Sequence, residues 1–236
     1  DLDLSVAFVA AVGGVVMTLL LRPDDPGWPW WAAIAVALLC TTAIGFVQAL
    51  VITKAGVPSF VVTLSGLLIW SGVVLILTTQ ASSVGTIRIQ DDTVIGIAND
   101  FLSDVQGWIL GALVVGVFAI VQVQTTRGRR AGGLIAKPTM VIVLQTLGLA
   151  AVTFAAVWYA NKDRGVPKVI VILGLFLVFW SFIATRTQFG RHVYSVGGSA
   201  EASRRAGINV DRVRITVFMI SGFMAGVGGI MLASRL

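Results

Sequence analysis

Long apolar runs recur along the sequence, and each of seven runs is long enough to cross a lipid bilayer. A membrane-spanning helix needs about 20 apolar residues, with a range of about 17 to 25. The runs lie at residues 5–21, 29–53, 61–78, 108–124, 141–160, 169–185 and 215–233. Backbone groups in lipid must be hydrogen-bonded within their own segment, and the runs lack the two-residue alternation of barrel strands, so each is predicted to be a helix. The predicted fold is an all-α, polytopic bundle of about seven spans, in one membrane domain over residues 1–236.

The composition supports lipid as the solvent for most of the chain. Hydrophobic residues make up 57% of the sequence and charged residues only 12%, whereas soluble domains are about one quarter charged. The net charge of +6 would suggest nucleic-acid binding in a soluble protein, but the basic residues cluster beside apolar runs, as membrane orientation requires. Cys40 is the single cysteine and lies within an apolar run, which favours a packing role and leaves no disulfide or metal cluster of cysteines.

The distribution of basic residues predicts the orientation of the spans. Residues 125–140 carry Arg127, Arg129, Arg130 and Lys137, and residues 186–214 carry six arginines. Residues 79–107 hold one arginine, Arg88, against four aspartates. Cytoplasmic loops are enriched in Lys and Arg, so the first two segments are predicted to be cytoplasmic and the third external. The short loop at 162–168 is then predicted to be external, so its basic residues are the exception to this rule.

A polar stretch within the second basic segment carries the signals of a short helix at residues 200–206. Ser199 is a suitable N-cap, and Glu201 lies in the first turn, where the helix dipole favours an anion. Arg205 lies four residues after Glu201, in the favourable order for an ion pair. Gly207 lies where a left-handed residue ends a helix. Such a helix on a cytoplasmic loop suits docking to a partner; the alternative is a basic loop that only sets the topology.

The residues around this helix resemble the coupling loop of bacterial ABC-type sugar importer permeases of the ribose, xylose and galactose type. The matching positions are Gly190, Arg191, His192, Tyr194, Gly197, Gly198, Glu201, Ala202, Arg204, Gly207, Ile208 and Asn209, with small-residue departures at Ser195, Ser199 and Ser203. The segments Asp3–Val6 and Gly56–Leu64 resemble earlier parts of the same family, and the loop 161–167 is nearest to the xylose-type branch. The resemblance covers essentially the whole chain.

This resemblance implies a multi-pass subunit of the bacterial inner membrane that is not itself an enzyme and needs no cofactor. The implied partners are an ATP-binding subunit, an external sugar-binding protein, a second permease copy and the lipid bilayer, without nucleic acid. The residues implied to couple to the ATPase are Gly197, Gly198, Ser199, Glu201, Ala202, Arg204, Arg205 and Gly207. The family has further spans on both sides of this region, so residues 1–236 are expected to be an internal fragment.

A neutral polyol crossing lipid needs hydrogen-bonding groups along its route, so polar residues within the spans are candidates for lining it. They are Gln48, Thr63, Ser65, Gln145, Thr146 and Ser181. The alternative for each is an interhelical hydrogen bond or a bond back to the preceding turn. No Asp, Glu, Lys or Arg lies deep in a predicted span, which makes a proton or ion relay hard to build.

Two other classes of protein compete with the importer. A secondary transporter or channel for a small neutral solute would need no ATPase, and Lys54–Pro58 is the one region that could be a broken helix rather than a turn. An intramembrane enzyme would need a nucleophile with a base, or a metal site. The single histidine, His192, lies beside Arg191 on the basic loop, and the HExxH and GxSxG motifs and the phosphate-binding loop are missing. No catalytic or metal-ligating residue is therefore assigned.

Overall fold

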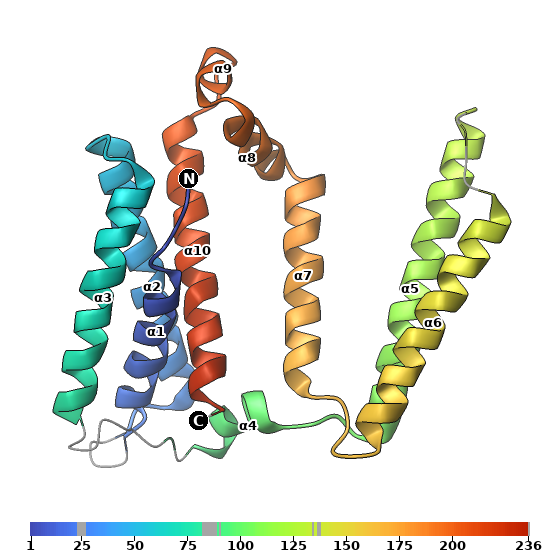
Figure 1. Cartoon of the computed structure of the whole chain (residues 1–236), viewed down its shortest axis with the longest axis horizontal. Coiled ribbons are helices and arrows are strands. Elements are labelled where there is room, and N and C mark those ends of the chain that lie inside the picture. Colours follow the sequence, from blue (N-terminus) through green and yellow to red (C-terminus); the bar gives the residue numbers. More distant parts are fainter. Residues whose placement is uncertain (23–26, 82–88, 90, 134, 136–137, 236) are drawn as a thin grey trace. The chain divides into compact units, whose positions relative to one another are not determined.

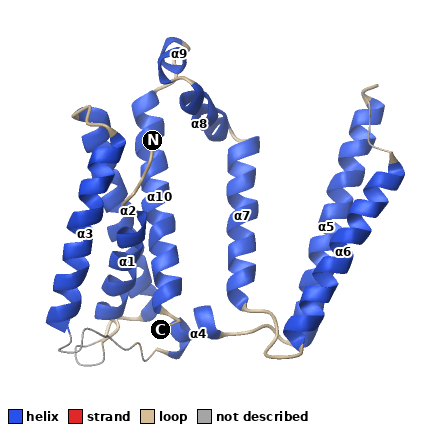
Figure 2. Ribbon diagram, in the orientation of Figure 1, coloured by secondary structure: helices blue, strands red, loops and turns tan. Residues whose placement is uncertain are grey.

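The computed structural model describes residues 1–22, 27–81, 89, 91–133, 135 and 138–235, and the named elements in this part of the chain are all helices, joined by loops (Figure 2). Its helices are α1 (Val6–Leu20), α2 (Trp30–Lys54), α3 (Ser59–Ala81), α4 (Asp92–Asn99), α5 (Asp104–Ala131), α6 (Thr139–Asn161), α7 (Lys168–Arg186), α8 (Gln188–Gly198), α9 (Ala200–Arg205) and α10 (Val210–Ala233). Of these, α2, α3, α5, α6, α7 and α10 are long and apolar enough to span a membrane. The all-α, polytopic fold predicted from the sequence is confirmed.

The first predicted span, residues 5–21, forms the shorter helix α1. Its 15 residues give a length of about 22 Å, less than the ~30 Å of a bilayer core. Six full-length candidates and this shorter apolar helix in the described residues agree with the prediction of about seven spans. Two helices, α4 and α8, were not predicted, and the basic residues Arg88 and Lys137 lie outside the described residues.

The chain divides into two compact units. The main unit contains Asp1–Asn99 and Ile172–Leu236, and the hairpin unit contains Asp100–Val171. In the hairpin unit, α5 and α6 pack side by side in opposite directions (Figure 1). The rings of Trp108 and Phe154 lie 5.8 Å apart across this pair. The hairpin unit is therefore held by contacts along two long helices rather than by a many-sided core.

In the main unit, α10 packs closely against both α1 and α2. A Cβ added at Gly222 would approach the carbonyl oxygen of Thr41 on α2 more closely than 3.0 Å, and one at Gly229 would do the same to the backbone of Ala10 on α1. Gly45 of α2 is equally close to the backbone of α10. Small residues let helix backbones approach in lipid. The small residues of α10 therefore form a packing face toward α1 and α2.

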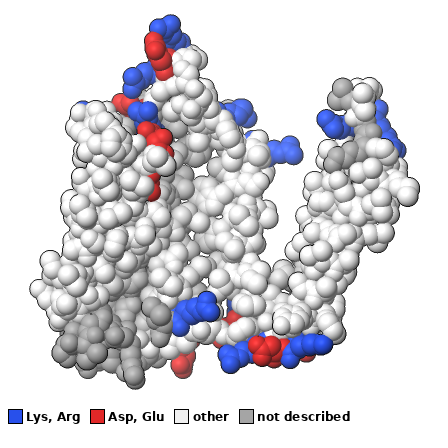
Figure 3. Space-filling model, in the orientation of Figure 1, with Lys and Arg blue, Asp and Glu red and all other residues white. Residues whose placement is uncertain are grey.

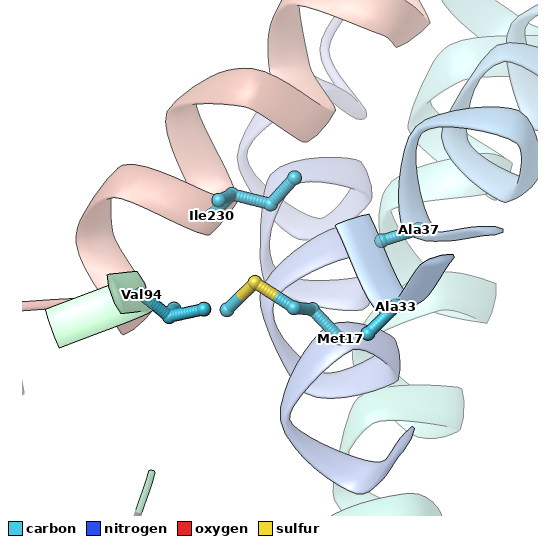
Figure 4. Close-up of a cluster of buried hydrophobic side chains, with 5 residues drawn as sticks. All are labelled: Met17, Ala33, Ala37, Val94 and Ile230. Carbon is cyan, nitrogen blue, oxygen red and sulfur yellow. The ribbon is translucent and has the colours of Figure 1, made fainter. Parts of the chain in front are cut away.

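A cluster of apolar side chains closes one end of the main unit (Figure 4). Met17 of α1 is fully buried between Ala33 and Ala37 of α2 on one side and Ile230 of α10 on the other. Val94 of α4 is also fully buried and points toward Met17 (Figure 4). The short helix α4 is thus part of the packed bundle and covers its end.

The helix termini place the turns of the main unit at two opposite ends. The α2–α3 turn, α8 and α9 lie at one end, and α4 lies at the other (Figure 1). Charged side chains gather near the helix ends and leave the middle of the helices largely uncharged (Figure 3). This arrangement fits the predicted orientation, in which the end with α9 is cytoplasmic.

The region Lys54–Pro58 is a turn. Helix α2 ends at Lys54, α3 begins at Ser59, and Gly56 between them has a φ of +68°. Glycine adopts this left-handed conformation without the steric penalty that other residues meet. Because the turn lies at the end of both helices, it is not a helix broken within the membrane, and the feature that favoured a secondary transporter is removed.

Candidate functional site

The predicted cytoplasmic helix is present as α9, and its ends are built as the sequence indicated. The Ser199 side chain accepts a hydrogen bond from the backbone N–H of Ala202 at 3.2 Å. The Arg205 guanidinium donates to the Glu201 carboxylate at 2.5 Å. Gly207 ends the segment with a φ of +83°. These contacts hold a six-residue helix that would be marginal as an isolated peptide.

The residues predicted to couple to an ATPase are all exposed. They are Gly197, Gly198, Ser199, Glu201, Ala202, Arg204, Arg205 and Gly207. Side chains of Glu201 and Arg205 are 78% and 80% exposed. In contrast, Ser203 in the same helix is only 1% exposed. Helix α9 therefore has one buried contact point and an otherwise free, charged surface.

Two polar contacts link this small helix to its neighbours, and a third extends from α10 to α2. The hydroxyl of Ser203 lies 2.8 Å from the hydroxyl of Ser195 on α8. Arg204 donates to Asp211 at the start of α10, at 3.2 Å. The other oxygen of Asp211 lies 3.7 Å from the ammonium group of Lys54 at the end of α2. Helix α9 thus contacts α8 and α10 directly, and Asp211 connects it to α2.

Helix α8, which precedes α9, was missed by sequence reasoning. The Thr187 side chain caps its start by accepting from the Gly190 N–H at 3.2 Å. Three glycines and many polar residues hide the helix from hydropathy. The available signal was the spacing of Phe189, Val193 and Val196, which places these apolar residues on one helix face. The predicted coupling residues Gly197 and Gly198 end this helix and are not part of a free loop.

The corner between α7 and α8 depends on Gly190. A Cβ added there would lie less than 3.0 Å from backbone atoms of Ala184 and Ile183, a distance at which the atoms clash. Because these are backbone atoms of α7, no side-chain rotation could relieve the clash. The corner therefore keeps α8 tightly folded against the end of α7.

Two candidate pathway residues, Gln48 and Thr63, are buried in the helix packing. The Gln48 amide donates to the hydroxyl of Ser5 at 2.9 Å, and its side chain is 6% exposed. Thr63 is fully buried and donates back to Ser59 at 2.9 Å and to the Leu2 carbonyl at 3.2 Å. Both residues therefore make the interhelical or back-bonding hydrogen bonds that were the alternative to lining the pathway.

The other candidate pathway residues are not brought together in one place. Ser65 on α3 and Ser181 on α7 are exposed. In the hairpin unit, Gln145 accepts from Gln122 at 3.3 Å, and Thr146 bonds back to Ile142 at 2.8 Å. The six residues therefore do not form a single lined route within either unit.

A polar group that sequence reasoning did not select lies at the start of the chain. One oxygen of Asp3 accepts from the Ser5 backbone at 3.0 Å and from its hydroxyl at 2.7 Å. The other oxygen accepts from Ser221 of α10 at 3.0 Å. Asp3 precedes the first helix, so a search for charges within apolar runs passes over it. Its carboxylate nevertheless reaches a serine near the middle of α10.

Comparison with known proteins agrees with this geometry. The family described as "Branched-chain amino acid transport system / permease component" matches residues 2–236. The chain belongs to this permease family. It is therefore a multi-pass membrane protein, and the resemblance to bacterial ABC sugar permeases is confirmed. Permease subunits of such transporters are not catalytic, in agreement with the absence of an assigned catalytic residue.

Several curated permeases match most or all of the chain. The xylose transport system permease protein XylH of Escherichia coli K12 is 34% identical over 237 residues, which cover 100% of this chain and 58% of that protein. XylH of Haemophilus influenzae is 29% identical over 88% of this chain and 56% of its own length. The ribose import permease protein RbsC of H. influenzae is 24% identical over 100% of this chain and 53% of its own length. This permease chain thus spans a little over half the length of these relatives, and no solved structure matches it.

Proposed function

We propose that this permease chain forms part of the membrane subunit of an ABC importer that carries a xylose- or ribose-like monosaccharide across the bacterial inner membrane. A separate ATP-binding subunit supplies the energy, and an external sugar-binding protein delivers the sugar. The observation that carries the proposal is α9, an exposed charged helix fixed at one buried point by Ser203. The 34% identity to a xylose permease over the whole chain supports the sugar class.

The proposed mechanism is mechanical, because the chain has no assigned catalytic group. The ATP-binding subunit docks on the exposed face of α9 and moves it when ATP binds. The contact of Ser203 with Ser195 passes this movement to α8, and the ion pairs of Asp211 pass it to α10 and α2. The corner at Gly190 then carries the movement of α8 into α7. The spans tilt and open the route for the sugar.

For the route itself, we assign the candidate polar residues according to their contacts. Ser65 and Ser181 have exposed side chains and keep the proposed role of lining the pathway, together with Gln145 and Thr146 of the hairpin unit. The polar atoms of Gln48 and Thr63 are engaged in hydrogen bonds within the bundle, so their proposed role is to hold the helices together. A second permease copy in the assembled importer is part of the proposal.

The test is a charge reversal on the docking face in the full-length protein. We expect Glu201→Arg to reduce sugar uptake to the background of cells without the transporter, because it removes the pair with Arg205 and reverses the charge offered to the ATP-binding subunit. Membrane insertion should be unchanged. Asp163→Arg, an equivalent reversal at an exposed position on the predicted external side, is the matched control and should leave uptake normal.

A proline in α9 tests the helix itself. Ala202→Pro removes the N–H that bonds to Ser199, so the expected destabilisation is that of a lost N-cap, about 1 kcal/mol, rather than the ~3 kcal/mol of a proline in a helix interior. Uptake should nevertheless be lost, because the docking face is reshaped. Normal binding of the ATP-binding subunit and normal uptake in both α9 variants would contradict the proposal. Sugar transport by the purified permease without any ATPase would favour the secondary transporter instead.

A further inference from the structure

A cavity of about 380 Å³ lies within the main unit, between the first residues of the chain, α8 and α10. Its polar wall is made by Asp1, Asp3, Arg214 and Ser221, and valines together with Phe218 form its apolar wall. Gly197, at the end of α8, also lines it. Small-molecule sites have volumes of about 300 to 1,000 Å³ and combine apolar walls with a few convergent polar groups. The cavity has both properties.

The cavity reaches deep into the bundle. Ser221 is the twelfth of the 24 residues of α10, so it lies about 16 Å along a helix of about 36 Å. Gly197 belongs to the end of the unit that carries the proposed docking helix. The cavity therefore connects the predicted cytoplasmic end with the middle of the membrane-spanning region, as a passage for solute must.

The charges on the polar wall are balanced by neighbours, but hydrogen-bonding capacity remains. Asp3 accepts from Ser221 at 3.0 Å, and the Arg214 Nε lies 3.0 Å from a carboxylate oxygen of Asp1. That Nε–H is not directed at the oxygen, and this buried donor has no hydrogen-bond partner among the described residues. The Arg214 side chain as a whole is 30% exposed, so its other guanidinium N–H groups are available to a ligand.

We propose that this cavity binds a neutral polyol, a monosaccharide on its way to the cytoplasm. The inference rests on the proposed function and deepens it, because it assigns part of the route to residues that were not among the six candidate pathway residues. The Arg214 guanidinium donates to a sugar oxygen through its N–H groups other than Nε, the free lone pairs of Asp1 and Asp3 accept from sugar hydroxyls, and Val217 packs on the C–H face of the ring. An ion pair within the wall favours a neutral ligand over an anion, which the two carboxylates would repel.

The first test fills the cavity from α10. In vesicles containing the full-length permease, its ATP-binding subunit and its sugar-binding protein, we expect Val217→Trp to abolish uptake of labelled D-xylose and D-ribose while the subunits still assemble and hydrolyse ATP. The matched control is Val152→Trp, at a 70% exposed position on α6 outside the cavity, which should transport normally. Normal uptake by Val217→Trp would overturn the inference and leave the proposed function standing. Absence of sugar uptake by the wild type would instead remove the proposed function.

The second test detects the ligand directly and does not depend on the bulky variant folding. Val217→Cys is made in a full-length protein in which Cys40 and any other cysteine are replaced, and its reaction with a water-soluble thiol reagent is timed from the cytoplasmic side. We expect D-xylose or D-ribose at ten times its Kd to slow the reaction about 11-fold, and leucine to have no effect. Protection by leucine, or equal rates with and without sugar, would refute a polyol site.

Discussion

The close approach of α10 to α2 at Gly222 provides the sharpest test of the packing. A Cβ at Gly222 would meet the carbonyl oxygen and carbon of Thr41 and the Cα of Gly45, all backbone atoms, the last two at 3.2 and 3.4 Å. None of these atoms can rotate away. Gly222→Ala must therefore push the two helices apart. Gly228 lies on the same helix, but nothing lies within 4 Å of a Cβ added there, so Gly228→Ala is the matched control.

The expected size of the effect follows from comparing the two variants. Replacing glycine by alanine within a helix stabilises it by about 0.5–1 kcal/mol, and this gain is shared by both variants. Forcing an additional methyl group into a well-packed interior destabilises a protein by about 1–3 kcal/mol, and this loss applies only to Gly222→Ala. The difference between the two free energies of unfolding is therefore expected to be about 1–3 kcal/mol.

The assay is thermal unfolding of the purified full-length protein in detergent, followed by intrinsic tryptophan fluorescence. The shift per kcal/mol is smaller for a longer protein than the value of about 2–4 °C for 150–250 residues, so Gly222→Ala should melt a few degrees below Gly228→Ala. The control should melt at or slightly above the wild type. Equal melting temperatures for the two variants would show that α10 and α2 do not approach each other closely at Gly222, and the packing argument would be wrong.

Two further predictions concern the contacts of α9. Asp211→Asn weakens the ion pairs with Arg204 and Lys54. Each pair is worth about 0–1 kcal/mol at a surface, so the melting temperature should change little, while ATP-driven uptake should fall severalfold. Unchanged uptake would contradict the proposal that Asp211 transmits the movement of α9. Ser203→Ala removes the partly buried bond to Ser195. A double-mutant cycle with Ser195→Ala, measured by thermal unfolding, should give a coupling of about 1 kcal/mol. Additive losses would exclude the bond.

Hydropathy predicted the spans well because the bilayer requires each spanning segment to be a continuous apolar run. The predicted run 169–185 became Lys168–Arg186, and 29–53 became Trp30–Lys54. Hydropathy failed where a helix extends into water. The run 108–124 is only the apolar part of Asp104–Ala131, whose ends are set by the cap at Ser103 and by an arginine-rich last turn.

The candidate site was only partly visible in the sequence. Helix α9 was predicted because caps and ion pairs act between near neighbours in sequence, as with Ser199, Glu201 and Arg205. Contacts between distant segments leave no such local pattern. The bond between Asp3 and Ser221 joins residues 218 positions apart. No rule of spacing could have predicted it, and the cavity built around this pair was missed for the same reason.

The close contact at Gly45 of α2 has a consequence for the biogenesis of the protein. Helices α1 and α2 leave the ribosome early, but their partner α10 begins only at Val210. At a synthesis rate of about 5–20 residues per second, α10 follows the end of α2 by roughly 8–30 s. During this interval the face around Gly45 lies against lipid, which small apolar residues tolerate. Helix α10 thus packs on a pair of helices synthesised well before it, and in nascent chains arrested before Val210 the face around Gly45 should be photo-crosslinked by lipid.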